Sequence, residues 1–267
     1  MDKKILAAFI LIVAVVTVAF AGCTGTPASS EEMEEVIIVE EKTVYIVGID
    51  GEYPPYSFID KDGNAQGFDV DSAKWIAENQ GFEVEFIPMA WDGIIPALLA
   101  GKIDMVYSGM TITPERLDKV NFSETYWVAN QGVAVRNGST VTMDDLMAGK
   151  VVIGTQRGCT AADWITENLI DKGLMPKDNL KLYENFPLAI ADLENERVDA
   201  AMYDTPVVIE SIQGKDVVKL GTIETNEDYG IAIRKDDVEL LNTMNEGLGN
   251  LMASPYWQEL IVKYKLA

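Results

Sequence analysis

Short apolar strands alternate with helical segments over most of this chain, and this alternation narrows the available folds more than any other feature. Val44–Ile49 is a β-branched run, and residues 83–86 alternate polar and apolar side chains with the period of a strand. Between these two runs, Ala73, Ile76 and Ala77 share one face of a helix. Strands that alternate with helices of about ten residues are typical of βαβ units. We therefore predict an α/β fold, built from mostly parallel sheets flanked by helices.

Two segments of the chain resemble each other. Residues 102–109 and 197–204 each begin with a basic residue, an apolar residue and an aspartate, and each continues as a short strand that ends in polar groups. A Thr-Pro pair soon follows each segment, at Thr113 and Thr205, and this pair favours a helix start with a capping hydroxyl. Such strand entries can also recur by chance. With 267 residues available, we interpret the repeat as one supersecondary unit used once in each of two α/β lobes.

The N-terminus has the pattern of an export signal. Lys3 and Lys4 precede an apolar run over residues 5–20, and Ala21-Gly22-Cys23 follows. This run is shorter than the roughly 20 residues that a membrane-spanning helix needs. Its end resembles the lipobox of prokaryotic lipoproteins, which predicts a signal peptide over residues 1–22 and acylation of Cys23. An ordinary signal peptide with an incidental cysteine is the alternative. Residues 23–42 would then form a lipid anchor and acidic linker on the extracytoplasmic face of the membrane.

Composition excludes several classes of function. The chain has 43 acidic and 21 basic residues, a net charge of −22, whereas nucleic-acid binding requires a basic surface. It contains no histidine, which excludes hydrolases that use Ser-His-Asp or Cys-His chemistry. Without histidine, and with Cys159 as the one cysteine besides Cys23, the usual zinc ligands are also missing. We expect a monomeric protein with no metal, no cofactor and no nucleic-acid partner.

Polar clusters follow four of the predicted strands, at residues 50–53, 108–111, 155–160 and 203–204. In open parallel sheets, ligands bind outside the carboxyl ends of the strands. Each cluster alone is also explained by turn or helix-cap chemistry. Because two clusters belong to each predicted lobe, we predict that the four converge on one cleft between the lobes.

Some of these residues are suited to a carboxylate. Arg116 falls in the first turn of the helix that Thr113 caps, and its guanidinium can bind a carboxylate with two hydrogen bonds. Residues 158–160 open another helix and can add backbone N–H donors. The alternative for Arg116 is a surface ion pair with Glu115 or Asp118.

Other residues are suited to the rest of an amino acid. Asp204 and Asp50 supply negative charge for an ammonium group, and Tyr53 and Trp91 offer aromatic faces that can enclose a side chain. A core position is the alternative for Trp91. A carboxylate site combined with an ammonium site predicts an α-amino acid as the ligand.

The chain contains the motifs Tyr-Pro-Pro-Tyr-Ser-Phe at 53–58, Gly-Phe-Asp-Val-Asp at 67–71, Trp-Asp-Gly-Ile-Ile-Pro-Ala-Leu at 91–98, Gly-Met-Thr-Ile-Thr-Pro-Glu-Arg at 109–116, Asn-Phe-Ser-Glu-Thr-Tyr at 121–126 and Tyr-Asp-Thr-Pro at 203–206. Together, these motifs resemble the family 3 extracellular solute-binding proteins, the polar amino-acid receptors of ABC importers. The resemblance extends from about Thr43 to the C-terminus. It implies a two-lobed periplasmic-binding-protein-like fold with two crossover hinge strands, near residues 128–132 and 222–229. Lobe 1 would comprise residues 43–129 and 227–267, and lobe 2 residues 130–226.

The resemblance also implies roles for individual residues. Arg116 and Thr111 match the positions that bind the ligand carboxylate, and Ser108 offers a backbone or hydroxyl contact. Thr160 matches a lobe 2 position near the carboxylate, and Asp204 matches the aspartate that binds the ammonium group.

The same comparison implies which residues surround the ligand side chain. Tyr53 and Trp91 match an aromatic pair, whereas Asp50 and Gln156 match polar positions beside it. Cys159 departs from the commoner threonine of the family, although its backbone N–H can still serve. The full predicted set is Asp50, Tyr53, Trp91, Ser108, Gly109, Thr111, Arg116, Gln156, Thr160, Tyr203 and Asp204.

The predicted function is that of an extracytoplasmic receptor, which closes two lobes over a polar L-amino acid and delivers it to the permease subunits of an ABC importer. Asp50 favours a glutamine-like or basic ligand, whereas an inward-pointing Arg157 would favour an acidic one. One alternative is a cleft enzyme of the same fold, similar to cyclohexadienyl dehydratase, with Asp50 or Asp204 as acid or base. A ligand-sensing module that signals through a separate partner is another.

Overall fold

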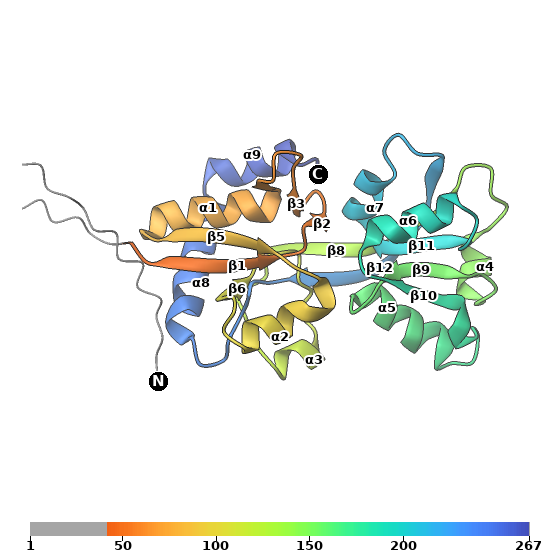
Figure 1. The fold of residues 1–267 in the computed structure, drawn as a ribbon, viewed down its shortest axis with the longest axis horizontal. Helices are drawn as coiled ribbons and strands as arrows, with labels where there is room; N and C mark the ends of the chain where they lie inside the picture. Colours follow the sequence, from red (N-terminus) through yellow and green to blue (C-terminus); the bar gives the residue numbers. More distant parts are fainter. Residues whose placement is uncertain (1–41, 267) are drawn as a thin grey trace, which may run out of the picture. The chain divides into compact units, whose positions relative to one another are not determined.

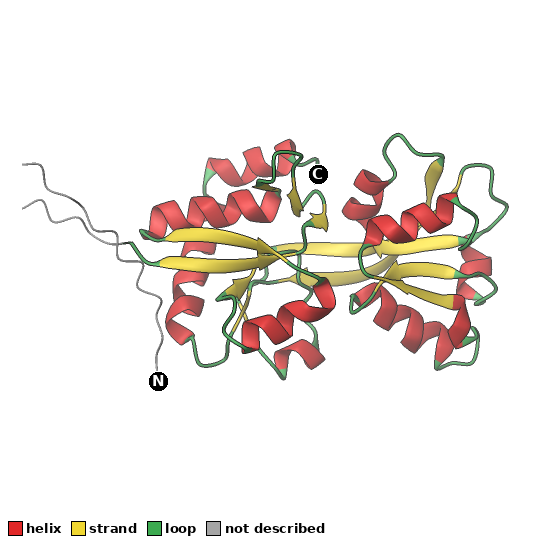
Figure 2. Ribbon diagram, in the orientation of Figure 1, coloured by secondary structure: helices red, strands yellow, loops and turns green. Residues whose placement is uncertain are grey.

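The computed structural model describes residues 42–266 and has the predicted mixed α/β class, with two five-stranded sheets flanked by helices (Figures 1 and 2). The predicted signal peptide, the lipidation site at Cys23 and the linker up to residue 41 lie outside the described residues. Within the described part, no helix is long and apolar enough to cross a bilayer.

The first sheet contains the first described strand and has the order β5-β1-β6-β13-β7. Strand β1 pairs in parallel with both β5 and β6, and β13 is antiparallel to β6 and β7. These strands are β1 (Val44–Ile49), β5 (Glu83–Pro88), β6 (Met105–Val106), β7 (Asn121–Phe122) and β13 (Ala232–Ile233). Its helical segments are α1 (Phe68–Gln80), η1 (Trp91–Gly93), α2 (Ile94–Leu99), α3 (Pro114–Leu117), α8 (Val238–Ala253) and α9 (Pro255–Lys263).

The second sheet has the order β10-β9-β11-β8-β12. Its first three strands are parallel, and β8 is antiparallel to both β11 and β12. The strands are β8 (Trp127–Arg136), β9 (Ile153–Gln156), β10 (Leu180–Tyr183), β11 (Ala200–Asp204) and β12 (Val217–Tyr229). The helical segments are α4 (Met143–Met147), α5 (Thr160–Ile165), η2 (Thr166–Ile170), η3 (Lys177–Asn179), α6 (Phe186–Glu194) and α7 (Thr205–Ser211). A small antiparallel sheet completes the fold, with β2 (Glu52–Tyr53), β3 (Ser57–Ile59) and β4 (Ala65–Gln66).

Two long strands connect the sheets. The chain passes from β7 of the first sheet into β8, and it returns along β12 before entering β13. Strands β8 and β12 pair antiparallel from Val217 opposite Arg136 to Tyr229 opposite Trp127 (Figure 1). The two predicted crossings fall within this pair of strands. The division into lobe 1 (43–129 and 227–267) and lobe 2 (130–226) remains a prediction.

The predicted repeat has a structural counterpart in each sheet. The Asp104 carboxylate accepts a hydrogen bond from the Ile46 N–H at 2.9 Å, while the Asp104 N–H donates to the Ile46 carbonyl at 2.7 Å. In the second sheet, Asp199 makes the same reciprocal pair with Val152, with both distances 2.8 Å. Each aspartate therefore ties the entry of one strand to a neighbouring segment, which explains why the same residue type occurs at both places.

Helix packing agrees with the predicted apolar face of α1, because Ala73, Ile76 and Ala77 are buried. The two Thr-Pro pairs behave differently. Thr113 caps α3 and accepts a hydrogen bond from the Arg116 N–H at 3.2 Å, as predicted. The predicted cap at Thr205 is wrong, because α7 already begins at Thr205 and Asp204 occupies the capping position. The Asp204 side chain makes no capping bond there.

Candidate functional site

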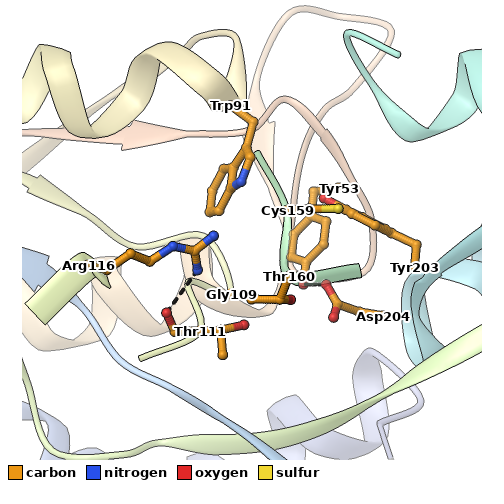
Figure 3. Close-up of a pocket in the computed structure, with 9 residues that line it drawn as sticks. All are labelled: Tyr53, Trp91, Gly109, Thr111, Arg116, Cys159, Thr160, Tyr203 and Asp204. Carbon is orange, nitrogen blue, oxygen red and sulfur yellow. Dashed lines mark hydrogen bonds between the residues drawn. The ribbon is translucent and has the colours of Figure 1, made fainter. Parts of the chain in front are cut away.

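A small cavity of about 10 Å³ gathers most of the predicted site residues. Its lining includes every predicted residue except Asp50, Ser108 and Gln156, and it adds Cys159 (Figure 3). The lining residues are Tyr53, Trp91, Gly109, Thr111, Arg116, Cys159, Thr160, Tyr203 and Asp204. They come from the strand ends and following segments that the sequence analysis singled out.

Asp204 lies at the end of β11 and is 6% exposed. Its carboxylate accepts hydrogen bonds from the Tyr53 hydroxyl at 2.6 Å and from the Gln131 amide nitrogen at 2.7 Å. Burial raises the pKa of Asp204 to about 7, and the negative charge of Glu227 adds to this rise. A buried carboxylate with a raised pKa is stabilised by a cation, so this end of the cavity is suited to an ammonium group.

Arg116 lies on the other side of the cavity (Figure 3). The cap at Thr113 fixes the helix that carries it, and its guanidinium donates to the Thr111 carbonyl at 2.8 Å and to the Gly158 carbonyl at 3.2 Å. The guanidinium carbon also lies 5.6 Å from the centre of the Trp91 ring. Arg116 makes no ion pair with any acidic residue in the described part of the chain, which leaves its charge available to an anion.

The three predicted residues outside this lining are buried beside it. The Gln156 amide donates to the Asp50 carboxylate at 2.8 Å, and the Tyr203 hydroxyl donates to the Gln156 amide oxygen. The Ser108 hydroxyl accepts from the Asp50 N–H at 3.0 Å. Burial raises the pKa of Asp50, whereas the bond from Gln156 opposes this rise. Asp50 therefore connects the predicted residues of the first sheet to Gln156 on β9.

Asp50 also lines a neighbouring, more open cavity of about 310 Å³. Glu52 and Glu184 contribute two further carboxylates to the wall of this cavity, and Asn185 contributes an amide. Acidic groups therefore dominate the polar part of this wall.

Aromatic packing shapes the cavity. The Tyr53 ring contacts Tyr203 edge-on, with ring centres 5.5 Å apart, and lies close against the backbone of Gly109. A Cβ atom at Gly109 would lie 2.5 Å from the Tyr53 ring, so only glycine fits there. The Trp91 indole nitrogen donates to the Gly158 carbonyl at 3.0 Å. Trp91 is therefore fixed by a polar contact rather than buried only as a core residue.

Arg157 does not enter the cavity. Its guanidinium pairs with Asp92 at 3.2 Å, and its side chain is 52% exposed. Arg157 therefore does not point inward, and it does not favour an acidic ligand.

The family model that describes the bacterial extracellular solute-binding proteins, family 3, matches residues 45–267. The chain belongs to this family. The resemblance read from the motifs is thereby confirmed.

The curated relatives of this solute-binding protein are named as amino-acid-binding proteins. A "Probable histidine-binding protein" of Neisseria gonorrhoeae is 33% identical over 228 residues, which cover 83% of this chain and 82% of the relative. The ABC transporter arginine-binding protein 1 of Escherichia coli is 31% identical over 80% of this chain and 87% of its own length.

Solved structures agree with this family fold. An ancestral arginine-binding protein bound to arginine is 36% identical, has a TM-score of 0.76, and matches 84% of this chain and 98% of its own. The ancestral amino acid-binding protein AncCDT-1, a precursor of cyclohexadienyl dehydratase, is 38% identical, has a TM-score of 0.74, and matches 83% of this chain and 95% of its own.

The structure also adds site residues that the sequence analysis missed. Glu227 on β12 accepts hydrogen bonds from the hydroxyls of Thr111 and Thr160, and Gln131 on β8 donates to Glu227 at 2.8 Å. Both Gln131 and Glu227 fall within the predicted crossing strands, yet neither belongs to a quoted motif.

A second missed feature supports the loop that precedes Thr111. The Asp69 carboxylate accepts from the Gly109 N–H at 2.6 Å and from the Tyr126 hydroxyl at 2.9 Å. Asp69 is fully buried, and burial raises its pKa to about 8. This explains the aspartate of the Gly-Phe-Asp-Val-Asp motif, because it holds the backbone that forms one wall of the cavity.

Proposed function

We propose that this solute-binding protein is an extracytoplasmic receptor that binds a polar L-amino acid between two lobes and delivers it to an ABC importer. The observation that carries the proposal is the presence of Arg116 and Asp204 in the lining of one cavity. A guanidinium can bind the ligand carboxylate, and a carboxylate can bind its ammonium group. The names of the relatives, which include histidine-, cystine- and arginine-binding proteins, support an amino acid as the ligand.

We further propose that the ligand has a basic or glutamine-like side chain. Asp50, Glu52 and Glu184 in the neighbouring cavity favour a cationic group, and Gln156 offers an amide. Ancestral relatives have been solved with arginine and with glutamine, which supports the same pair of ligands. Because the acidic groups outnumber the basic ones here, arginine is the first ligand to test.

The remaining assignments complete the proposal. The eleven predicted residues form the ligand site, with the cavity residues around the amino-acid backbone and Asp50 and Gln156 beside the side chain. The protein is monomeric, it closes by movement of lobe 2 (130–226) relative to lobe 1, and it is tethered to the outer face of the membrane through Cys23. Permease subunits of an importer are its partners.

We propose a receptor rather than an enzyme. The named relatives are binding proteins, and the precursor of cyclohexadienyl dehydratase is itself described as an amino acid-binding protein. An aspartate that faces an ammonium group stays ionised, which makes it a poor proton donor.

Calorimetric titration of the purified protein with each of the twenty common amino acids tests this function. We expect binding of arginine or glutamine, for which micromolar affinity corresponds to about −8.2 kcal/mol. Absence of binding to every amino acid would refute the receptor proposal. Conversion of a bound ligand, detected by mass spectrometry, would favour the enzyme.

A further inference from the structure

Helix η1, which follows strand β5 of the first sheet, contacts the turn that follows strand β9 of the second sheet. The Trp91 indole nitrogen donates to the Gly158 carbonyl at 3.0 Å, and the Arg157 guanidinium pairs with the Asp92 carboxylate at 3.2 Å. We call these two interactions the rim contact. Their partners are 67 and 65 positions apart in the chain, so the rim contact exists only while the two segments meet in space.

The Gly158 carbonyl also holds the arginine of the ligand site. A carbonyl oxygen has two lone pairs, and this one accepts a second hydrogen bond from the Arg116 guanidinium at 3.2 Å. Arg116 and Trp91 both line the cavity, and the guanidinium carbon lies 5.6 Å from the centre of the Trp91 ring (Figure 3). One backbone carbonyl of the second sheet's turn therefore orients two side chains that we propose to contact the ligand.

A second cavity lies on the other side of the rim contact. It has a volume of about 230 Å³, and Trp91, Asp92, Arg116 and Gly158 all contribute to its wall. Trp91 and Arg116 line the cavity of the ligand site as well, so the two cavities share these side chains. Separation of Trp91 and Arg116 from the Gly158 carbonyl therefore gives a bound ligand a route out through the second cavity.

The pair of Arg157 with Asp92 is the charged part of the rim contact. Among the ion pairs of the described residues, it is the one that joins a segment of the first sheet to a segment of the second. The two side chains are 52% and 41% exposed, so salt screens their attraction and the stabilisation is small. An attraction that is present only while the segments meet acts mainly on the rate at which they separate.

We propose that Arg157 is a positioning residue, which through its ion pair with Asp92 keeps the rim contact closed and thereby slows release of the bound amino acid. The proposal rests on the amino-acid receptor function and deepens it. Arg157 is absent from the cavity lining, so it acts through Trp91 and Arg116 and not by touching the ligand. This gives a role to the one arginine of the 155–160 cluster that the proposed ligand site leaves unused.

The rate of ligand release tests this role. Wild-type protein, Arg157→Gln, Asp92→Asn, their double variant and Arg197→Gln are loaded with L-arginine or L-glutamine, and dissociation is followed by stopped-flow tryptophan fluorescence at about 0.01 M and at about 1 M salt. Arg197→Gln is the matched control, because Arg197 is 68% exposed and pairs with Asp192 beside the same sheet. It removes the same charge without touching the rim contact.

We expect Arg157→Gln and Asp92→Asn each to release the ligand about two- to fivefold faster than the wild type at low salt. At high salt the difference should vanish, because the pair is then screened in the wild type as well. The double variant should match the single variants, since one substitution already removes the pair. Arg197→Gln should stay within about 1.5-fold of the wild type.

Three results would overturn the proposal: release from Arg157→Gln within about 1.5-fold of the wild type, an acceleration that persists at high salt, or effects that add in the double variant. If Arg157→Gln does not fold, as judged by its thermal melt, Asp92→Asn carries the same expectation. A wild-type protein that binds neither arginine nor glutamine would refute the receptor function and this inference together. Wild-type binding with unchanged release in the variants would refute the inference alone.

Discussion

The side-chain amide of Gln156 donates a hydrogen bond to the carboxylate of Asp50 at 2.8 Å, which joins the end of β9 to the segment that follows β1. Gln156 is the last residue of a strand in the second sheet, Asp50 directly follows a strand of the first, and both are almost fully buried. An unpaired carboxylate at this depth would be costly, so the contact stabilises the arrangement in which the two sheets meet at the site. The same carboxylate lines the acidic neighbouring cavity, so Asp50 connects this contact to the choice of ligand.

Replacement of Asp50 should change selectivity more than stability. We expect Asp50→Asn to weaken arginine binding by about tenfold or more, because a guanidinium loses its buried negative partner, while glutamine binding changes less. Asp62→Asn, which removes the same charge from an exposed loop, should leave both affinities within about twofold. Calorimetric titration with both ligands measures the ratio. An unchanged ratio of arginine to glutamine affinity in Asp50→Asn would contradict the proposed basic subsite.

Removal of the Arg116 side chain should reduce binding of every amino acid. Arg116→Ala leaves the ligand carboxylate without its charged partner, and we expect a loss of about 2–5 kcal/mol in binding free energy. Arg116→Lys should also bind poorly, since one ammonium cannot reproduce the planar pair of donors. Lys119→Ala is a suitable control, because Lys119 is exposed and pairs with Glu115. Affinity of Arg116→Ala within about threefold of the wild type would disprove the carboxylate assignment.

Binding should depend on pH through Asp204, whose pKa burial raises to about 7. Below this pKa the carboxyl is protonated and neutral, so its attraction for the ligand ammonium is lost, whereas above it the carboxylate is ionised. Affinity should therefore rise between about pH 5.5 and about pH 8. The groups that face Asp204 are Tyr53, Gln131, Tyr229 and Glu227.

The matched variants isolate this effect. Asp204→Asn should bind weakly and with little dependence on pH, and Asp216→Asn, an exposed change of the same charge, should keep the wild-type profile. Titrations at several pH values provide the measurement. A wild-type affinity that stays constant over this range would exclude Asp204 as the titrating partner of the ammonium group.

A side chain at position 109 should lower the stability of the protein. Gly109 has a φ of 54°, and a Cβ atom there would lie 2.5 Å from the Tyr53 ring. Gly138 has a φ of 77° but no heavy atom within 4 Å of the corresponding position, so Gly138→Ala introduces backbone strain alone. We expect Gly109→Ala to lower the free energy of unfolding by about 1–3 kcal/mol more than Gly138→Ala does, because of the added overpacking. Equal losses in chemical denaturation would show that Tyr53 simply moves aside.

Local patterns in the sequence predicted a large part of this architecture. The alternation of strands and helices gave the fold class, and the polar clusters at strand ends identified most of the cavity lining. These predictions succeed because the spacing of apolar residues depends on residues close together in the chain. The same holds for the capping of a helix, as at Thr113. The failure at Thr205 has a tertiary cause: the Asp204 backbone takes the capping position, while the Asp204 side chain bonds Tyr53, 151 positions away in the chain.

Long-range contacts account for what the sequence analysis missed. Glu227 reaches Thr111 over 116 positions and Gln131 over 96, and no local pattern connects residues so far apart. The burial of Asp69 could likewise not be read from its motif, because its partners Gly109 and Tyr126 lie on other segments. Residue types at strand ends therefore identified what the cavity contains, but not how those groups are oriented.

Each sheet is stabilised by a reciprocal pair of hydrogen bonds of its own: Asp104 with Ile46 in the first sheet, and Asp199 with Val152 in the second. Neither pair of hydrogen bonds involves a residue from the other sheet. A segment that carries one sheet could therefore be transplanted between members of this family with these bonds intact. Chimaeric receptors, joined within the long paired strands β8 and β12, offer a direct route to combining the ligand preference of one protein with the transporter docking of another.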